Sequence, residues 1–166
     1  MLRLRFFATI CSLALLATGL GWGTAIVASE PASASPFKNL SGSWRGRGRI
    51  SLSSGRVERI SCRAYYNPKS DGRRLGFAIR CAAPSYKIEI RSQLNYRGGR
   101  VSGSWVERTF NASGAISGSA RTGKLALRVN GTVSGRINIS FSGGSQVVAI
   151  RTIGTALRSV RIAMSR

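Results

Sequence analysis

Histidine is absent from the 166-residue sequence, so the chain lacks the commonest general base and the commonest metal ligand of proteins. Beyond residue 34 its acidic residues are Glu58, Asp71, Glu89 and Glu107. They are dispersed, and no two have the spacing that paired carboxylates need for glycoside hydrolysis. Serine is abundant, but without a base it serves as a residue of turns and strands. The sequence therefore predicts a non-enzymatic protein that needs no metal or other cofactor.

Two cysteines, Cys62 and Cys81, follow an N-terminal apolar segment that itself contains Cys11. An even pair of cysteines in an exported chain predicts a disulfide bond. Because that bond would use both thiols, neither a thiolate nucleophile nor a zinc site is expected.

Cationic side chains are in large excess. The chain has 26 Lys and Arg against 5 Asp and Glu, and Arg3, Arg5 and Glu30 precede residue 35, so residues 35–166 carry 24 cations, 4 acids and a net charge of +20. A charge of this size attracts polyanions, and the planar guanidinium of arginine pairs with phosphate and carboxylate groups. The densest stripe of arginines occupies three alternate positions of one expected strand, at Arg45, Arg47 and Arg49. The candidate anion-binding residues are Arg45, Arg47, Arg49, Arg59 and Arg63.

Trp44, Trp105 and Glu107 fall on the apolar faces of their expected strands and are candidates for the interior of a barrel. The two tryptophans would either fill the core or line a ligand cavity. Many neighbouring inward positions are Gly, Ala or Ser, which would leave room for a cavity. Glu107 would either anchor a ligand at the barrel mouth or pair with a nearby arginine such as Arg158.

Short runs of alternating apolar and polar residues begin at Ser41, and turn residues separate them, for example at residues 53–55, 98–99 and 130–131. This pattern predicts an all-β fold, an antiparallel up-and-down meander of 8–10 strands that closes into a small barrel with one disulfide. No helix and no internal linker are indicated.

The cysteines also test the register of one predicted hairpin. If residues 56–66 pair with residues 74–82 so that Cys62 faces Cys81, every facing pair of this set lies on the apolar side of its strand. The other facing pairs are Ala64 with Ile79 and Tyr66 with Phe77. The disulfide would then mark the inside of the barrel and place the arginine stripe on the outside.

Gly42-Ser43-Trp44 opens the first expected strand and resembles the G-x-W of lipocalin- and avidin-type barrels, the calycin superfamily. The repeated apolar-Ser-Gly pattern, as at residues 101–103, is similar to that of avidin-type strands. The resemblance implies a closed barrel in which Trp44 plugs one end, covered by an arginine of the last strand, Arg158 or Arg161. It also implies a small ligand carried within the barrel.

The first 34 residues are predicted to be a secretory signal peptide. A basic start with Arg3 and Arg5 precedes the apolar stretch Phe6–Leu20, and Ala32-Ser33-Ala34 fits the cleavage pattern before Ser35. Cleavage after Ala28 is the second choice. Residues 35–166 would then be a single basic β-barrel domain in the periplasm or outside the cell. The alternative is a retained membrane anchor, because residues 6–27 carry no charge.

Charge and architecture together favour an exported binding protein whose arginine-rich exterior associates with anionic polymers. Those polymers would be lipopolysaccharide, acidic glycan or nucleic acid, bound without sequence specificity. One alternative is a calycin-like carrier of a small ligand in the barrel. Another is a secreted module of the protease-inhibitor type, with residues 35–41 as an extended arm. The sequence carries no indication of an oligomeric state.

Overall fold

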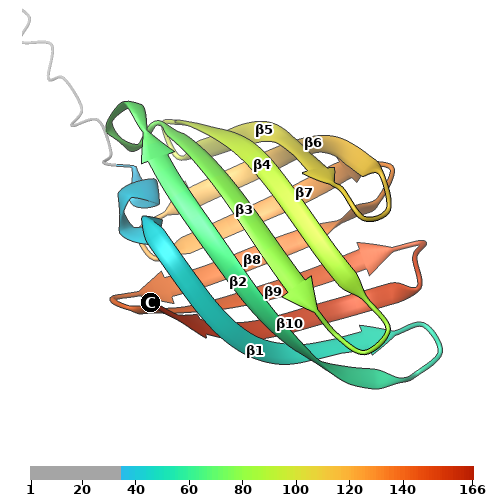
Figure 1. Cartoon of the computed structure of the whole chain (residues 1–166). Helices are drawn as coiled ribbons and strands as arrows, with labels where there is room; N and C mark the ends of the chain where they lie inside the picture. The colour runs from blue at the N-terminus through green and yellow to red at the C-terminus, as the bar shows by residue number, and fades with distance from the viewer. Residues whose placement is uncertain (1–34) are drawn as a thin grey trace, which may run out of the picture. The chain divides into compact units, whose positions relative to one another are not determined.

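The computed structural model describes residues 35–166, which form a closed antiparallel barrel (Figure 1). Each strand pairs with its neighbours in sequence, and the last pairs with the first. The strands are β1 (Gly42–Leu52), β2 (Val57–Lys69), β3 (Arg74–Ala82), β4 (Lys87–Arg97), β5 (Arg100–Glu107), β6 (Ala112–Arg121), β7 (Lys124–Gly131), β8 (Ser134–Ser142), β9 (Ser145–Ile153) and β10 (Leu157–Ser165). The predicted all-β barrel is confirmed. The predicted signal peptide, residues 1–34, lies outside the described residues.

The predicted register of β2 and β3 is confirmed. Cys62 lies opposite Cys81, and their sulfur atoms are bonded at 2.10 Å. The other two predicted pairs also face each other, and the inward residues of every strand contribute to one core. Because side chains alternate across a strand, the inward disulfide places the odd-numbered arginines of β1 and β2 on the outer surface.

One end of the barrel is closed by the 3-10 helix η1 (Pro36–Leu40), which the sequence did not indicate. Phe37 and Leu40 are fully buried, and Ser35 Oγ accepts the N–H of Phe37 at the helix start. Trp44 is equally buried, and its indole N–H donates to the Leu40 carbonyl at 2.8 Å. Trp44 therefore plugs this end as expected. The expectation of an extended arm over residues 35–41 is wrong, because the apolar side chains of this segment are buried in the barrel end.

Arg166 is the arginine that covers Trp44, so the expectation of Arg158 or Arg161 is wrong. The Arg166 guanidinium lies 4.8 Å from the centroid of the Trp44 ring and donates to the Asn39 carbonyl at 2.8 Å. Trp44 lies at the end of the barrel where β10 finishes, so a residue just beyond β10 reaches it. Arg158 lies near the start of β10, at the other end, and Arg161 is exposed on the outer face.

Glycines at inward positions of β1 allow the contact with β10 that closes the barrel. A Cβ atom added to Gly46 or Gly48 would overlap backbone carbonyl oxygens of β10. The alternating Arg-Gly sequence of β1 therefore serves two faces: glycine permits the closure inside, and arginine projects outside.

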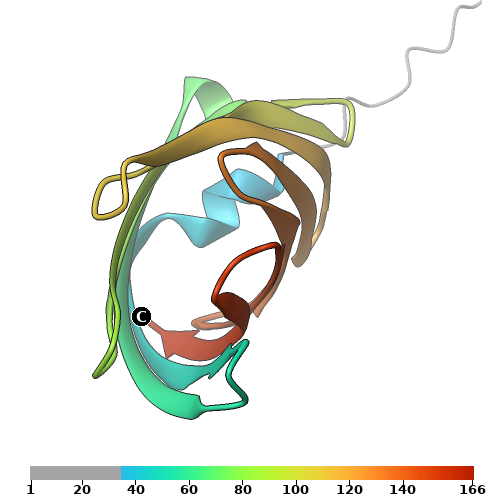
Figure 2. The same ribbon diagram turned by 90° about the vertical axis from the view of Figure 1, so that its right-hand side faces the viewer.

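The other end of the barrel is surrounded by five loops, those that follow β1, β3, β5, β7 and β9, and Figure 2 looks into it, with η1 at the far end. The second 3-10 helix, η2 (Ser70–Gly72), joins β2 to β3 at the closed end. Within residues 35–166 no helix is long and apolar enough to cross a bilayer. The closed sheet, its core and its disulfide all lie in this range, which therefore contains the whole of the barrel.

Candidate functional site

The barrel interior contains a cavity of about 430 Å³ that is lined almost wholly by apolar side chains. This volume falls in the range of about 300–1,000 Å³ that is usual for small-molecule sites. Isoleucines from many strands form the walls. Among the lining residues are Ile60, Phe77, Ile79, Ile88, Trp105, Ile116, Ile137, Ile139, Ile150 and Ile162. The barrel is therefore hollow between its closed end and its mouth.

The number of strands explains the cavity. A barrel of about eight strands has an interior that side chains just fill, and the diameter grows with each added strand. Here ten strands close the sheet, and several inward positions carry little or no side chain. One of these positions, Ala112 on β6, lines the cavity. Ile79 and Ile150, from opposite walls, remain only partly buried.

Trp105 lies on the cavity wall and is 7% exposed. Its indole N–H has no hydrogen-bond partner within residues 35–166. Trp44 lies deeper, packed between η1 and Arg166 outside the cavity lining. The two tryptophans predicted for the interior are thus separated, because Trp44 closes the barrel and Trp105 faces its hollow part.

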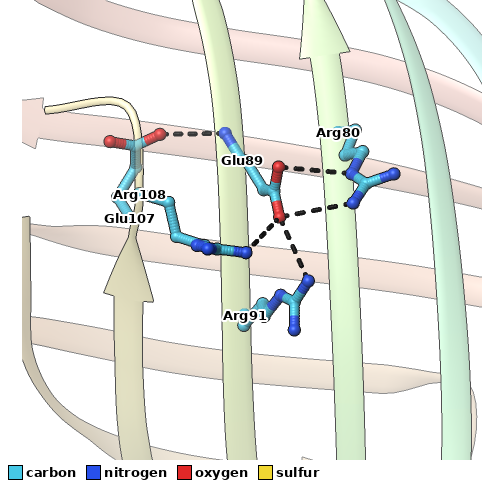
Figure 3. Close-up of polar contacts among 5 residues, drawn as sticks. All are labelled: Arg80, Glu89, Arg91, Glu107 and Arg108. Carbon is cyan, nitrogen blue, oxygen red and sulfur yellow. Dashed lines mark hydrogen bonds and ion pairs between the residues drawn. The ribbon is translucent and has the colours of Figure 1, made fainter. Parts of the chain in front are cut away.

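Glu107 is 6% exposed, and its carboxylate accepts the backbone N–H of Glu89 at 2.8 Å (Figure 3). It also accepts the backbone N–H of Phe110 at 2.6 Å. Burial alone would raise the pKa of Glu107, but these bonds and those from Thr109 bring it below its ordinary value. The predicted partner Arg158 is not involved. Glu107 fastens the β5–β6 loop to β4, so both of its oxygens are already engaged.

The inner floor of the cavity is formed by Tyr66, which the sequence placed only on the apolar face. Its hydroxyl donates to Gln146 Oε1 at 3.3 Å, and burial raises the pKa of Tyr66 to about 12. The Tyr66 ring packs on Phe77 with a centroid distance of 5.7 Å. Tyr66 is therefore a neutral donor whose hydrogen bond stays inside the protein.

An aromatic pair stands at the mouth. Tyr86 of the β3–β4 loop and Phe110 of the β5–β6 loop line the cavity, with ring centroids 6.2 Å apart. Phe110 is nevertheless 59% exposed. Sequence reasoning missed Phe110 because it lies in a turn, where alternation gives no indication of direction.

The acidic residues of the open end are engaged with nearby donors. Glu89 accepts ion pairs from Arg80, Arg91 and Arg108 at 3.3 to 3.4 Å (Figure 3). Desolvation opposes the charged form, but the three guanidinium groups keep the pKa of Glu89 below its ordinary value. No free carboxylate remains on this part of the outer surface.

Glu58 joins two loops of the mouth, the β1–β2 loop and the β3–β4 loop. It accepts the hydroxyl and the backbone N–H of Ser85 at 2.6 and 3.0 Å, and Arg56 pairs with it at 2.7 Å. The Ser85 hydroxyl is the main cause of the lowered pKa of Glu58. The acids of the open end therefore fasten the strands and loops around the mouth.

The outer surface carries three rows of directly opposed arginines, all of them exposed. The first row joins β1, β2 and β3, the second β10, β1 and β2, and the third β7, β8 and β9. The rows are Arg45–Arg63–Arg80, Arg161–Arg49–Arg59 and Arg128–Arg136–Arg151. Within residues 35–166 only Arg80 of these nine forms an ion pair. Like charges directly opposite each other destabilise a sheet, so this arrangement has a cost in free energy.

All five candidate anion-binding arginines lie on this surface. The structure brings Arg45 opposite Arg63 and Arg49 opposite Arg59, whereas Arg47 faces Ser61. A broad open groove lies over the same wall, with small residues at its base. Its lining includes Ser43, Arg45, Arg47, Ser61, Arg63, Tyr65, Ala78, Arg80, Ala82 and Lys87.

The positive charge is unevenly spread over the outer surface. The outer faces of β5 and β6 carry cations only near their ends and are otherwise small and neutral. Their outward residues between those ends are Ser102, Ser104, Val106, Ser113, Ala115, Ser117 and Ser119. Within residues 35–166 no group of three His, Cys, Asp or Glu side chains could hold a metal ion.

Two solved structures are similar to this barrel in fold. Rv2717c from M. tuberculosis has a TM-score of 0.61 and 17% identity, and the match covers 77% of this chain and 92% of that one. The S-type phycobiliprotein lyase CPES from Guillardia theta has a TM-score of 0.52 and 10% identity, with 78% and 88% covered. Both likenesses are of fold alone, and this chain shares the antiparallel barrel architecture of the two proteins. No family model and no curated protein matches the chain.

Proposed function

We propose that this protein is a non-enzymatic carrier that holds a small, largely apolar molecule inside its barrel. The observation that carries the proposal is the apolar cavity of about 430 Å³ beneath a mouth that no helix of residues 35–166 covers. The sequence placed this function second, behind polymer binding, and the hollow interior is what moves it forward. A lyase shares the fold, so the fold itself is neutral about catalysis.

The lining determines the class of ligand. The arginines of the strands point outward, so the cavity offers no cation to a buried anion. Its carboxylate, Glu107, is held by backbone N–H groups and is not free to act as a base or a ligand anchor. We therefore expect an uncharged molecule rich in hydrocarbon, because burying an unpaired charge here would be costly.

A fluorescence titration tests the carrier proposal. In residues 35–166 of a Trp44→Phe variant, Trp105 is the remaining tryptophan, so its emission reports on the cavity wall. Nile red, a neutral apolar dye, should quench Trp105 in a saturable manner at one dye per protein.

The matched variants fill the cavity or leave it open. Ile79→Phe with Ile150→Phe adds bulk from opposite walls and should abolish saturable quenching. Val106→Phe adds an aromatic ring to the outer face and should leave binding unchanged. Equal binding by the cavity-filling variant and the control would overturn the proposal, provided that both have the circular dichroism of the parent.

A second function is supported by a separate observation, the three arginine rows. We propose that the outer surface formed by these rows binds anionic polymers such as lipopolysaccharide, acidic glycan or nucleic acid. Opposed arginines without acids between them are unfavourable in the free protein, and a polyanion would relieve that repulsion. The two functions use opposite faces of the same strands, so they are compatible.

Retention on immobilised heparin in a salt gradient tests the second function. Arg49→Gln with Arg59→Gln removes two opposed arginines from one row. Arg97→Gln with Arg100→Gln removes the same charge from an opposed pair at the β4–β5 turn. The row variant should elute at a clearly lower salt concentration than the control. Equal elution of both variants would show that net charge alone determines retention, and it would refute the proposed binding site.

A further inference from the structure

Three exposed apolar side chains lie around the open end of the barrel. Val57 at the start of β2 is 60% exposed, Phe110 in the β5–β6 loop is 59% exposed, and Ile153 at the end of β9 is 75% exposed. Single exposed apolar residues are ordinary on protein surfaces. These three, however, belong to the start of β2, the β5–β6 loop and the end of β9, which are widely separated around the closed sheet. All three segments lie at the open end of the barrel (Figures 1 and 2).

Their spacing indicates the shape of a partner. A small protein or peptide would contact one part of the rim, because β2, β5 and β9 lie at different positions around the closed sheet. A flat surface laid across the mouth would contact all three side chains at once. The rim formed by Val57, Phe110 and Ile153 therefore fits a planar partner.

The charges near the rim indicate the chemistry of that partner. Arg158 and the third arginine row, Arg128–Arg136–Arg151, lie close to this end and form no ion pair within residues 35–166. The acids of this end, Glu58, Glu89 and Glu107, are all engaged as described above. A surface with phosphate groups outside and an apolar interior complements both features.

We infer that the rim docks on the headgroup surface of an anionic lipid bilayer. Val57, Phe110 and Ile153 enter the headgroup layer, and the neighbouring arginines pair with lipid phosphates. The mouth of the cavity then faces the bilayer, so an apolar molecule passes between lipid and barrel without crossing water. The use of this contact for loading rests on the proposed carrier function, whereas the docking itself does not.

Vesicle co-sedimentation tests the docking with residues 35–166. Vesicles that contain phosphatidylglycerol should bind the protein, and binding should weaken steeply with salt because exposed charges are screened. Vesicles of phosphatidylcholine alone should bind it far less. Equal binding to both kinds of vesicle, or none to either, would overturn the inference.

Substitutions at the rim locate the contact. Val57→Asp and Ile153→Asp should each reduce partitioning by about tenfold, since each exchanges an inserted apolar group for a like charge. Val106→Asp, on the outer face of β5, makes the same change at a residue that is 47% exposed and should have little effect. A loss in all three variants alike would mean that net charge drives binding and would refute the rim contact.

Insertion can also be observed directly. In a Trp44→Phe and Trp105→Phe background, Phe110→Trp places one tryptophan on the rim, and its emission should shift to the blue on vesicle addition. An unchanged emission from vesicle-bound protein would place the contact elsewhere. A rim-dependent dimer, detected by light scattering and abolished by Ile153→Asp, would assign the surface to a second copy of the chain and overturn the inference.

The two proposals fail separately. Val57 and Ile153 do not line the cavity, so their variants should bind Nile red normally in the absence of vesicles. Vesicle binding without dye binding would refute the carrier and leave the docking. Dye binding without vesicle binding would refute the docking and leave the carrier.

Discussion

Arg49 lies between two arginines, and its replacement should stabilise the protein. Arg59 is its direct neighbour on β2, and Arg161 is its direct neighbour on β10. Arg49→Glu would turn two like-charged pairs into two opposite-charged pairs in a single step. Because the side chains are exposed, each pair contributes modestly, roughly 0.2–1 kcal/mol in either direction.

The expected gain follows from the two pairs. Removing two repulsions and adding two attractions should raise the free energy of unfolding by about 1–2 kcal/mol, after allowance for solvent screening. For a domain of this length, that is a rise in melting temperature of about 4–8 °C. Thermal unfolding at low salt, followed by circular dichroism, measures it. At 1 M salt the Debye length is about 3 Å, so most of the gain should vanish.

The matched control is Arg97→Glu, which makes the same charge change beside one opposed arginine, Arg100. Its gain should be about half as large. If Arg49→Glu is no more stable than Arg97→Glu, or if its gain persists at 1 M salt, the inference that Arg49 is repelled by both of its opposed arginines is wrong. Arg49→Glu should also weaken heparin retention, so that stability and polymer binding change in opposite directions.

Three further outcomes follow from the contacts. Glu107→Gln should lower stability by about 1–3 kcal/mol in chemical denaturation at pH 7, because an amide is a weaker hydrogen-bond acceptor than a carboxylate for the two backbone N–H groups. Since the folded pKa of Glu107 is lowered, this difference should be full above the unfolded value of about 4.3 and disappear as the pH falls through the folded pKa. Arg166→Ala should expose Trp44, which acrylamide quenching of its emission detects, while Nile red binding persists. Cys62→Ala with Cys81→Ala should cost about 3 kcal/mol of stability and leave the far-ultraviolet spectrum of the barrel unchanged. For the Glu107 and cysteine variants, stability equal to that of the parent would refute the contact, and for Arg166→Ala unchanged quenching of Trp44 would do so.

The strands and their inner faces could be predicted because they follow from the alternation of apolar and polar residues, which is a local pattern. A residue's side of a strand follows from alternation, and Cys62 and Cys81 fixed the register of one hairpin through a bond that needs close approach. The exposure of the β1 and β2 arginines followed from the same parity. The opposed pairs Arg45–Arg63 and Arg49–Arg59 were also within reach of hairpin reasoning.

The candidate site depended on distances that no local pattern encodes. Closure at ten strands set the barrel width, and the width left a cavity instead of a filled core. Contact between β10 and β1 brought Arg161 beside Arg49 and completed a row across the two ends of the chain. The same closure carried Arg166 to Trp44, where the sequence had suggested other arginines.

The sequence by itself therefore determined which residues face inward, which cysteines pair and where the basic surface lies. Side-chain alternation and hairpin pairing act between near neighbours, and a linear pattern records both. The tertiary structure decided that the barrel is hollow, that Glu107 binds backbone N–H groups, and that three apolar side chains share one rim. Those features depend on the radius of the closed sheet and on turns, where the period of alternation is lost.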